Sequence, residues 1–312
     1  MSSIEISSDD KGPSAAPERR SLAALRAELD AIDDALLAGL QRRAAIVAEV
    51  AALKNGGIPL RPGREAAILR RLLGRNTGNP LPCQALVRVW REILAGSLAQ
   101  QGHFTVVVSE AKSGADNAIA LLAREHFGAL TPIRTHRSPS QAIGEVAAGH
   151  ASAAVLPLPV EEDASGTPWW TALLHQEAAP LSRAEGPGER TRINIVARLP
   201  FWAARPEGAP RANAFALAAI TPDESGADRT LFGLEFPAET SRARLASQIA
   251  AAGLSAGTIL LRREGEQKTA QALVDLAGFI AEDDPRLAAI EGLLRPAVRL
   301  GAYAEPFEDD QP

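Results

Sequence analysis

The feature that most constrains this chain is a long proline-free segment, residues 21–54, in which apolar residues recur every three or four positions. This period predicts a long amphipathic helix. Arg43 and Lys54 continue the apolar stripe with positive charge. Because an unpaired charge is costly to bury, these cations need acidic partners or a bound anion. The apolar positions of the stripe are Leu22, Leu25, Leu29, Ile32, Leu36, Leu40, Val47 and Val50.

The spacing of the cations limits which of them can share a ligand. Arg43 and Lys54 are eleven residues apart, so they lie on nearly the same helix face, roughly 16 Å apart, and could hold opposite ends of one small dianion. Arg26 lies roughly 25 Å before Arg43 along a straight helix. If Arg26 is also a ligand, it must serve the equivalent site of a second, antiparallel subunit. The alternative for each cation is a stem that follows the edge of the core with its charge in solvent.

Two more helices are expected after the first. One begins near Gly63 and carries Arg64 and Glu65 in its first turn. The other covers residues 82–101 and places Ser97 and Gln101, four residues apart, on one side. Taken alone, that hydroxyl and amide are ordinary surface polar groups. The expected apolar face of this third helix consists of Leu86, Val89, Trp90, Ile93, Leu94 and Leu98.

Residues 22–101, with the segments LRAELDAIDDALLAGLQRR, PLRPGRE and REILAGSLAQQ, resemble the AroQ-type chorismate mutases, which are small all-helical enzymes that form intertwined dimers. Arg61 stands where some members have an acidic residue that contributes to the ring-hydroxyl end of the site. The resemblance implies chorismate as substrate and catalytic roles for Lys54, Gln101, Arg43 and Glu65. Residue by residue, it implies that the two carboxylates of chorismate are bound by Arg26 of the partner subunit and by Arg43, the ether oxygen by Lys54 and Gln101, the carboxylate region by Arg64, the ring hydroxyl by Glu65, and a carboxylate by Ser97.

The chemistry of that family suits these residue types. Conversion of chorismate to prephenate is an intramolecular rearrangement that requires no nucleophile, metal or redox cofactor, so neither a cofactor nor a metal site is expected. An enzyme can accelerate it by holding the compact conformer and by stabilising the charge that develops in the transition state. Lys54 would oppose the negative charge that grows on the ether oxygen. Arginine suits the carboxylates because its planar fork binds them bidentately.

Charge and composition restrict the other function classes. Residues 21–101 hold eleven Lys and Arg against seven Asp and Glu, a balance of +4 in a chain of net charge −5. We expect no nucleic-acid binding, because these cations are embedded in helices with few aromatic residues. No apolar run of membrane-spanning length and no secretory leader are expected, which indicates a cytoplasmic protein. The single cysteine, Cys83, makes a cysteine-rich metal site implausible. Residues 1–20 are predicted to be disordered.

The segment 103–228 alternates strands and helices and is predicted to be an α/β domain. It resembles the first lobe of a prephenate dehydratase, but the motifs of that family are replaced by SEAKSGADN and VLPLPVEEDASG. The threonine-bearing catalytic triplet has two altered counterparts, residues 191–193 or residues 213–215. Residues 183–213 are expected to be a loop that replaces deleted structure. We therefore expect a degenerate domain without dehydration chemistry.

Residues 229–308 are predicted to follow the order βαββαβ, the ferredoxin-like order of an ACT regulatory domain. The ending LGAYAEPF resembles the close of the ACT domain fused to prephenate dehydratases, whereas the phenylalanine-binding turns of that family are replaced by PAETSRARL and LLRREGEQK. The expected molecule is a homodimeric chorismate mutase with a three-helix domain at 21–102. The alternatives are a bifunctional mutase-dehydratase, a pyruvate-eliminating relative that acts on isochorismate, and a metabolite-binding regulator.

Overall fold

The computed structural model describes residues 20–53, 57–110, 117–161, 168–176, 179–180, 190–202, 207–208, 211–263 and 268–307. The chain divides after Glu49 into two compact units, and each is described by itself. Lys54 lies outside the described residues, and so does the tail predicted to be disordered, apart from Arg20.

Helix α1 (Leu22–Leu53) confirms the long helix expected from the apolar period. The described part of the first unit contains residues 22–49 of this helix and no other element, and none of the residues of α1 is buried. Leu22 is 63% exposed and Leu36 is 59% exposed. A helix with an uncovered apolar stripe gains little stability from its own chain, because most helical stability in proteins comes from packing of the apolar face. No helix in the described part of the chain is long and apolar enough to span a membrane.

Helices α2 (Pro62–Asn76) and α3 (Cys83–Gln101) are the second and third helices expected from the sequence. Pro62 suits the first turn of α2, where a backbone N–H has no helical partner. The predicted apolar face of α3 was wrong at Val89, which is 53% exposed, because Val87 and Arg91 turn towards the core instead. A shared apolar cluster joins both helices to later parts of the chain, and its buried members are Ala66, Leu69, Leu73, Leu86, Val87, Phe201, Trp202 and Ala304.

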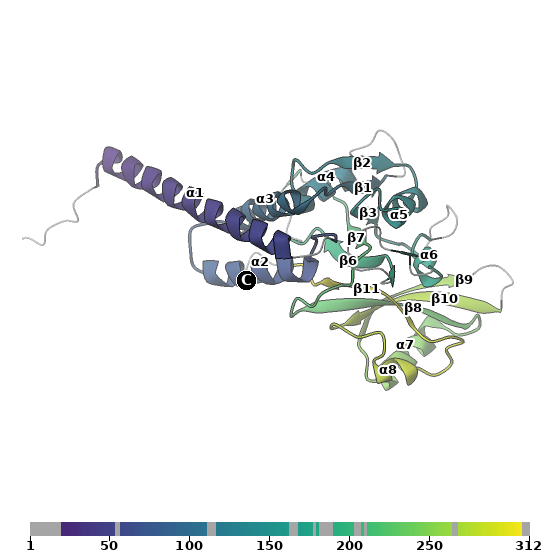
Figure 1. Ribbon diagram of the computed structural model, residues 1–312. Helices are drawn as coiled ribbons and strands as arrows, with labels where there is room; N and C mark the ends of the chain where they lie inside the picture. The colour runs from purple at the N-terminus through teal and green to yellow at the C-terminus, as the bar shows by residue number, and fades with distance from the viewer. Residues whose placement is uncertain are drawn as a thin grey trace, which may run out of the picture. The chain divides into compact units, whose positions relative to one another are not determined.

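All described strands except two short ones form one nine-stranded sheet. Its order is β2-β1-β3-β7-β6-β11-β8-β10-β9 (Figure 1). Strands β1, β2 and β3 are parallel, whereas β7 runs antiparallel to both β3 and β6. Helices α4 and α5 cover opposite faces, because alternate residues of β1 contact each of them. The elements of this half are β1 (Val106–Ser109), α4 (Ala118–Phe127), β2 (Ile133–His136), α5 (Pro139–Ala147), β3 (Ala153–Pro157), α6 (Thr171–Leu174), β6 (Asn194–Leu199) and β7 (Ala214–Ala218), with a separate pair β4 (Ala179–Pro180) and β5 (Arg190–Thr191).

Strand β6 corrects one expectation. Residues 183–213 were predicted to be a loop, but Asn194–Leu199 forms a strand inside the sheet. Its apolar residues Ile195 and Leu199 are fully buried, and they pack in the apolar clusters on opposite faces of the sheet. The glycines, prolines and arginines around this short strand obscured its apolar pattern.

The C-terminal half confirms the predicted βαββαβ order. Its four strands lie in the order β11-β8-β10-β9, with β8 paired antiparallel to both β10 and β11. Helix α8 is shorter than expected, with only four residues. The elements are β8 (Asp228–Pro237), α7 (Arg242–Ala251), β9 (Ala256–Arg263), β10 (Thr269–Ala277), α8 (Pro285–Ala288) and β11 (Val298–Ala304).

The two halves of the sheet meet where β11 lies parallel to β6, with Gly301 opposite Ile195. Gly301 has a φ of 145°, a conformation that residues with a Cβ rarely adopt. A Cβ at this position would lie 2.0 Å from the carbonyl oxygen of Ile195. The segments predicted as an α/β domain and as an ACT-like domain thus share one continuous sheet, which the sequence did not reveal.

Candidate active site

The two arginines of α1 that are expected in the site differ in their surroundings. Arg26 is exposed, whereas Arg43 is half-buried. Burial lowers the pKa of the Arg43 guanidinium, although an arginine in a protein stays protonated. Both residues belong to the first unit, while the other described site residues belong to the second. Lys54, expected at the ether oxygen, lies outside the described residues.

The polar pair of α3 lies together on one side of the helix, as its spacing predicts. The side-chain amide of Gln101 donates from Nε2 to the backbone carbonyl of Ser97 over 2.9 Å. The Ser97 hydroxyl donates to the backbone carbonyl of Ile93 over 2.8 Å. Both side chains are half-buried, so they present hydrogen-bonding atoms at the edge of an apolar surface.

Glu65 of α2 forms an ion pair with Arg91 of α3, and both side chains are buried. Arg91 donates from Nη1 to Oε2 of Glu65 over 3.0 Å. Burial raises the pKa of Glu65, and the charge of Arg91 opposes that rise. The guanidinium also lies 5.1 Å from the centroid of the Phe201 ring. Arg91 was not among the predicted site residues, although its spacing from Val87, Leu94 and Leu98 places it on the same helix face as these apolar residues.

The first turn of α2 is tied to a residue far along the chain. The exposed side chain of Arg61 donates from Nε to Oδ2 of Asp223 over 3.0 Å. The backbone N–H of Arg64 also donates to Oδ2, and that of Gly63 donates to Oδ1. The Arg64 side chain is exposed. Arg61, which departs from the acidic residue of some family members, is thus an ion-pair partner of Asp223, a residue that no local pattern could have identified.

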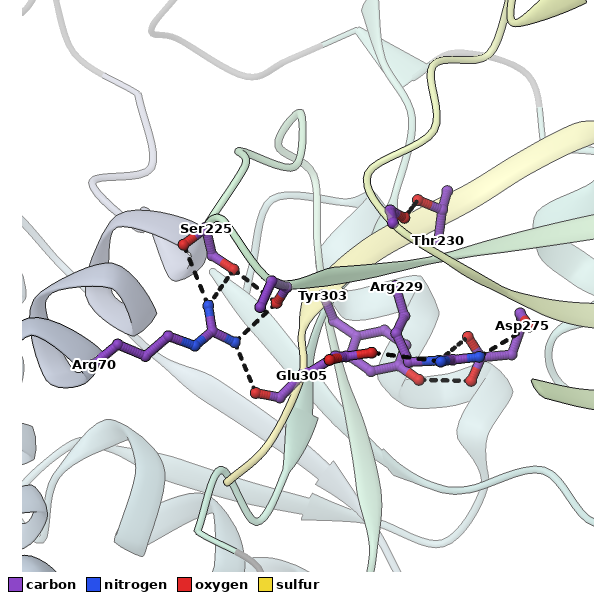
Figure 2. Close-up of polar contacts among 9 residues, drawn as sticks. Arg70, Ser225, Arg229, Thr230, Asp275, Tyr303 and Glu305 are labelled. Carbon is purple, nitrogen blue, oxygen red and sulfur yellow. Dashed lines mark hydrogen bonds and ion pairs between the residues drawn. The ribbon is translucent and has the colours of Figure 1, made fainter. Parts of the chain in front are cut away.

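A second attachment of α2 involves Arg70 (Figure 2). Its guanidinium donates to the backbone carbonyls of Ser225, Ala227 and Glu305 and to the Ser225 hydroxyl, over 2.7 to 3.2 Å. These acceptors lie just before β8 and just after β11. The helix that carries Arg64 and Glu65 is therefore fixed to both ends of the C-terminal βαββαβ segment.

Figure 2 also shows a polar cluster inside the sheet. Asp275 accepts a hydrogen bond from Nε of Arg229 over 2.8 Å and another from the Tyr303 hydroxyl over 2.7 Å. Burial raises the pKa of Tyr303, and the neighbouring Asp275 adds to the rise. Asp275 thus joins β10 to β8 and β11 through side chains that satisfy one another's hydrogen bonds. Of the two altered triplet segments, residues 213–215 lead into the buried strand β7, and Arg192 of the other is ion-paired with Glu282.

A cavity of about 490 Å³ lies beside α3 and α4, on the side of α3 that carries Arg91. Its lining mixes cations and carboxylates with aromatic rings, including Arg88, Arg124, Glu125 and Trp202. The lining also includes His126, whose Nε2 atom has no hydrogen-bond partner among the described residues. Burial holds the pKa of His126 well below its usual range, and the charge of Arg91 lowers it further.

Comparison with known proteins bears directly on the helical segment. Residues 25–102 match the family model described as chorismate mutase type II. The matched stretch includes every residue expected to bind chorismate, from Arg26 to Gln101. Residues 25–102 are a chorismate mutase type II domain. The described part of this mutase domain is helical, and the mixed α/β sheet follows it.

Curated relatives of the mutase domain are larger proteins. The chain is 30% identical over 148 residues to a bifunctional chorismate mutase/prephenate dehydratase of Stutzerimonas stutzeri, a match that covers 45% of this chain and 40% of that protein. A protein of the same description from Pseudomonas aeruginosa is 31% identical over 144 residues, with 44% and 38% covered. The chain thus spans less than half the length of these relatives. The first match covers 45% of the chain, which is more than the whole of residues 1–102, so it extends into the α/β segment.

Two solved structures overlap with a larger part of the chain at lower identity. A prephenate dehydratase from Streptococcus mutans is 16% identical with a TM-score of 0.41, and the match covers 65% of this chain and 99% of that one. The quorum-quenching acylase GqqA is also 16% identical, with a TM-score of 0.43, and 64% and 94% of the two chains are covered.

Proposed function

We propose that this protein is a chorismate mutase that converts chorismate to prephenate. The observation that carries the proposal is the family match over residues 25–102, which includes every charged and polar residue of the expected site. The proposed location is the cytoplasm, and the pathway served is aromatic amino-acid biosynthesis.

In the proposed mechanism, the arginines hold the two carboxylates of chorismate and so favour the compact conformer in which the reacting carbons approach each other. Lys54 and Gln101 donate to the ether oxygen, where negative charge grows as the carbon–oxygen bond lengthens. Glu65 and Ser97 complete the binding of the ring hydroxyl and of a carboxylate. The half-buried positions of Ser97 and Gln101 on one side of α3 support these roles.

We propose that the active unit is a homodimer in which Arg26 serves the site of the second subunit. The uncovered apolar stripe of α1 supports this assembly, because the described part of its own unit offers no element to bury that stripe. The equivalent helix of a second copy, running antiparallel, has a matching stripe and would bring its Arg26 towards the distant site.

A bifunctional mutase-dehydratase is the second candidate, because the curated relatives carry that description and the first match extends beyond the mutase domain. The altered motifs argue against it. One candidate for the dehydratase triplet, residues 213–215, leads into the buried strand β7. The other, residues 191–193, keeps the threonine and arginine but has Ile193 in place of the family's aromatic residue. We propose that the α/β segment descends from a dehydratase and has lost its chemistry.

The test of the mutase proposal is a direct assay of chorismate consumption and prephenate formation by the purified full chain. Lys54→Ala should lower kcat by a factor of at least ~100, because a preorganised electrostatic donor contributes about 3 to 4 kcal/mol. Lys268→Ala, in the loop before β10, is a matched control that should keep normal turnover. A wild-type chain without activity would refute the proposed function, and near-normal turnover of Lys54→Ala would remove Lys54 from the mechanism.

A further inference from the structure

Helix α2 begins without a capping side chain of its own. Its N-cap residue, Arg61, makes no capping hydrogen bond, and Pro62 follows directly. The cap comes instead from Asp223, in the connection between β7 and β8, which accepts hydrogen bonds from the backbone N–H groups of Gly63 and Arg64 over 2.9 Å and 3.0 Å. Asp223 thus performs for α2 the role that Ser, Thr, Asp or Asn usually performs within the helix sequence itself.

The contact between this connection and α2 is close. A Cβ on Gly63 would lie 2.1 Å from the backbone oxygen of Asp223 and 3.0 Å from its Cγ. Glycine therefore allows the two backbones to touch, and the Asp223 side chain is left only 18% exposed. The Arg70 attachment holds the same connection two turns further along α2, at Ser225 and Ala227. Two separate contacts fix the axis and the first turn of the helix.

The charge of Asp223 acts at the same place. Its carboxylate pairs with Arg61, so the positive charge of Arg61 is compensated before the chain reaches Arg64. A carboxylate at a helix N-terminus is also favoured by the helix dipole. Arg64 and Glu65 follow at once, the first with an exposed side chain and the second held by Arg91. The direction of both side chains depends on the backbone geometry of this turn.

We infer that Asp223 is a positioning residue of the mutase site, which holds the first turn of α2 so that Arg64 and Glu65 meet the substrate in a fixed geometry. This inference rests on the proposed function. It assigns to a residue of the α/β segment, more than a hundred positions beyond the mutase domain, a part in the chemistry of that domain. Misplacement of a binding group by about 1 Å can cost a factor of up to ~100 in rate.

The test uses Asp223→Asn in the full chain. Asparagine keeps the shape and one acceptor oxygen, but its NH₂ group cannot accept. The variant therefore loses either the hydrogen bond from the Gly63 N–H or those from Arg61 Nε and the Arg64 N–H. Asp284→Asn is the matched control, because Asp284 also caps a helix that begins with proline and also pairs with an arginine, Arg286, at α8. We expect kcat/KM for chorismate to fall about tenfold or more in Asp223→Asn, mostly through kcat, and to stay within about twofold in Asp284→Asn.

Thermal midpoints and amide hydrogen exchange separate positioning from a general loss of stability. Both variants should lower the thermal midpoint by similar amounts, while faster exchange at Gly63 and Arg64 should occur only in Asp223→Asn. Faster exchange with unchanged kcat would overturn the inference, as would unchanged exchange. If the wild-type chain fails to convert chorismate, the proposed function fails, and the exchange measurement still reports whether Asp223 holds the turn.

Discussion

Gly63→Ala and Gly74→Ala are predicted to change the stability of α2 in opposite directions. Both glycines lie in the same helix, where alanine is favoured over glycine by about 1 kcal/mol. A Cβ on Gly74 meets no atom within 4 Å, whereas a Cβ on Gly63 would lie 2.1 Å from the backbone oxygen of Asp223 and 2.7 Å from its carbonyl carbon. Helix propensity alone would therefore stabilise both variants, and the contact with Asp223 decides the difference.

The magnitude follows from the size of the overlap. The Asp223 oxygen must retreat by about 1 Å to restore ordinary contact, and a backbone shift forced by an extra carbon costs about 1 to 3 kcal/mol. The same shift weakens the two capping hydrogen bonds, and a lost helix cap costs about 1 kcal/mol. After the propensity gain, the free energy of unfolding of Gly63→Ala should fall by about 1 to 3 kcal/mol. Gly74→Ala should gain up to about 1 kcal/mol.

Urea unfolding followed by tryptophan fluorescence measures this difference, because Trp90 and Trp202 pack in the apolar cluster that includes α2. The wild-type chain and both variants should be compared at one protein concentration, since association would change the apparent stability. If Gly63→Ala proves as stable as Gly74→Ala, the close approach of the β7–β8 connection to α2 does not exist in solution, and the argument for Asp223 falls with it.

Three further predictions concern subunit sharing, product and pH. Mixing the inactive variants Arg26→Ala and Lys54→Ala should restore part of the mutase activity, because one site of a mixed dimer then has both intact residues; no recovery after confirmed subunit exchange would contradict sharing. The full chain should form prephenate and no phenylpyruvate above a matched blank at neutral pH, and enzymatic phenylpyruvate would establish the bifunctional alternative. Because the folded pKa of His126 lies below its unfolded value, the unfolded chain takes up the extra proton as the pH falls below about 6.5, and stability should decrease by at most about 1.4 kcal/mol per pH unit. His126→Gln should reduce that slope in urea titrations at several pH values, and an unchanged slope would show that His126 is not its source.

The three helices could be predicted from the sequence because a period of 3.6 is a local signal that needs no knowledge of the partner. The βαββαβ order was equally accessible, since each strand from β8 to β11 has its own apolar run between turn residues. At Val89, however, the predicted apolar face was wrong. The expected apolar face of α3 included Val89 and not Val87, whereas packing against Phe201 and Trp202 buries Val87 and leaves Val89 exposed.

The parts that escaped prediction depend on contacts between distant residues. Asp223 is 160 positions from Gly63, and neither residue belongs to a motif that indicates the other. All of the proposed site residues remain predictions, as do the domain boundaries at 102 and 228; these residues are Arg26, Arg43, Lys54, Arg64, Glu65, Ser97 and Gln101. The ion pair of Glu65 with Arg91 links two helices, and the local pattern of neither helix indicates its partner on the other.

The junction between β6 and β11 has a consequence for any attempt to divide the protein. A cut near residue 228 would remove β11, one of the two neighbours of β6. The buried strand β6 would then be the edge of a five-stranded sheet, with unpaired N–H and C=O groups and with the fully buried Ile195 uncovered. Such edges template association with other chains. A shortened protein of this kind should precipitate or pair edge to edge, even though the sequence places a domain boundary at that residue. The whole sheet, from β1 to β11, should therefore be kept intact in any shortened protein, because the close approach at Gly301 joins its two parts.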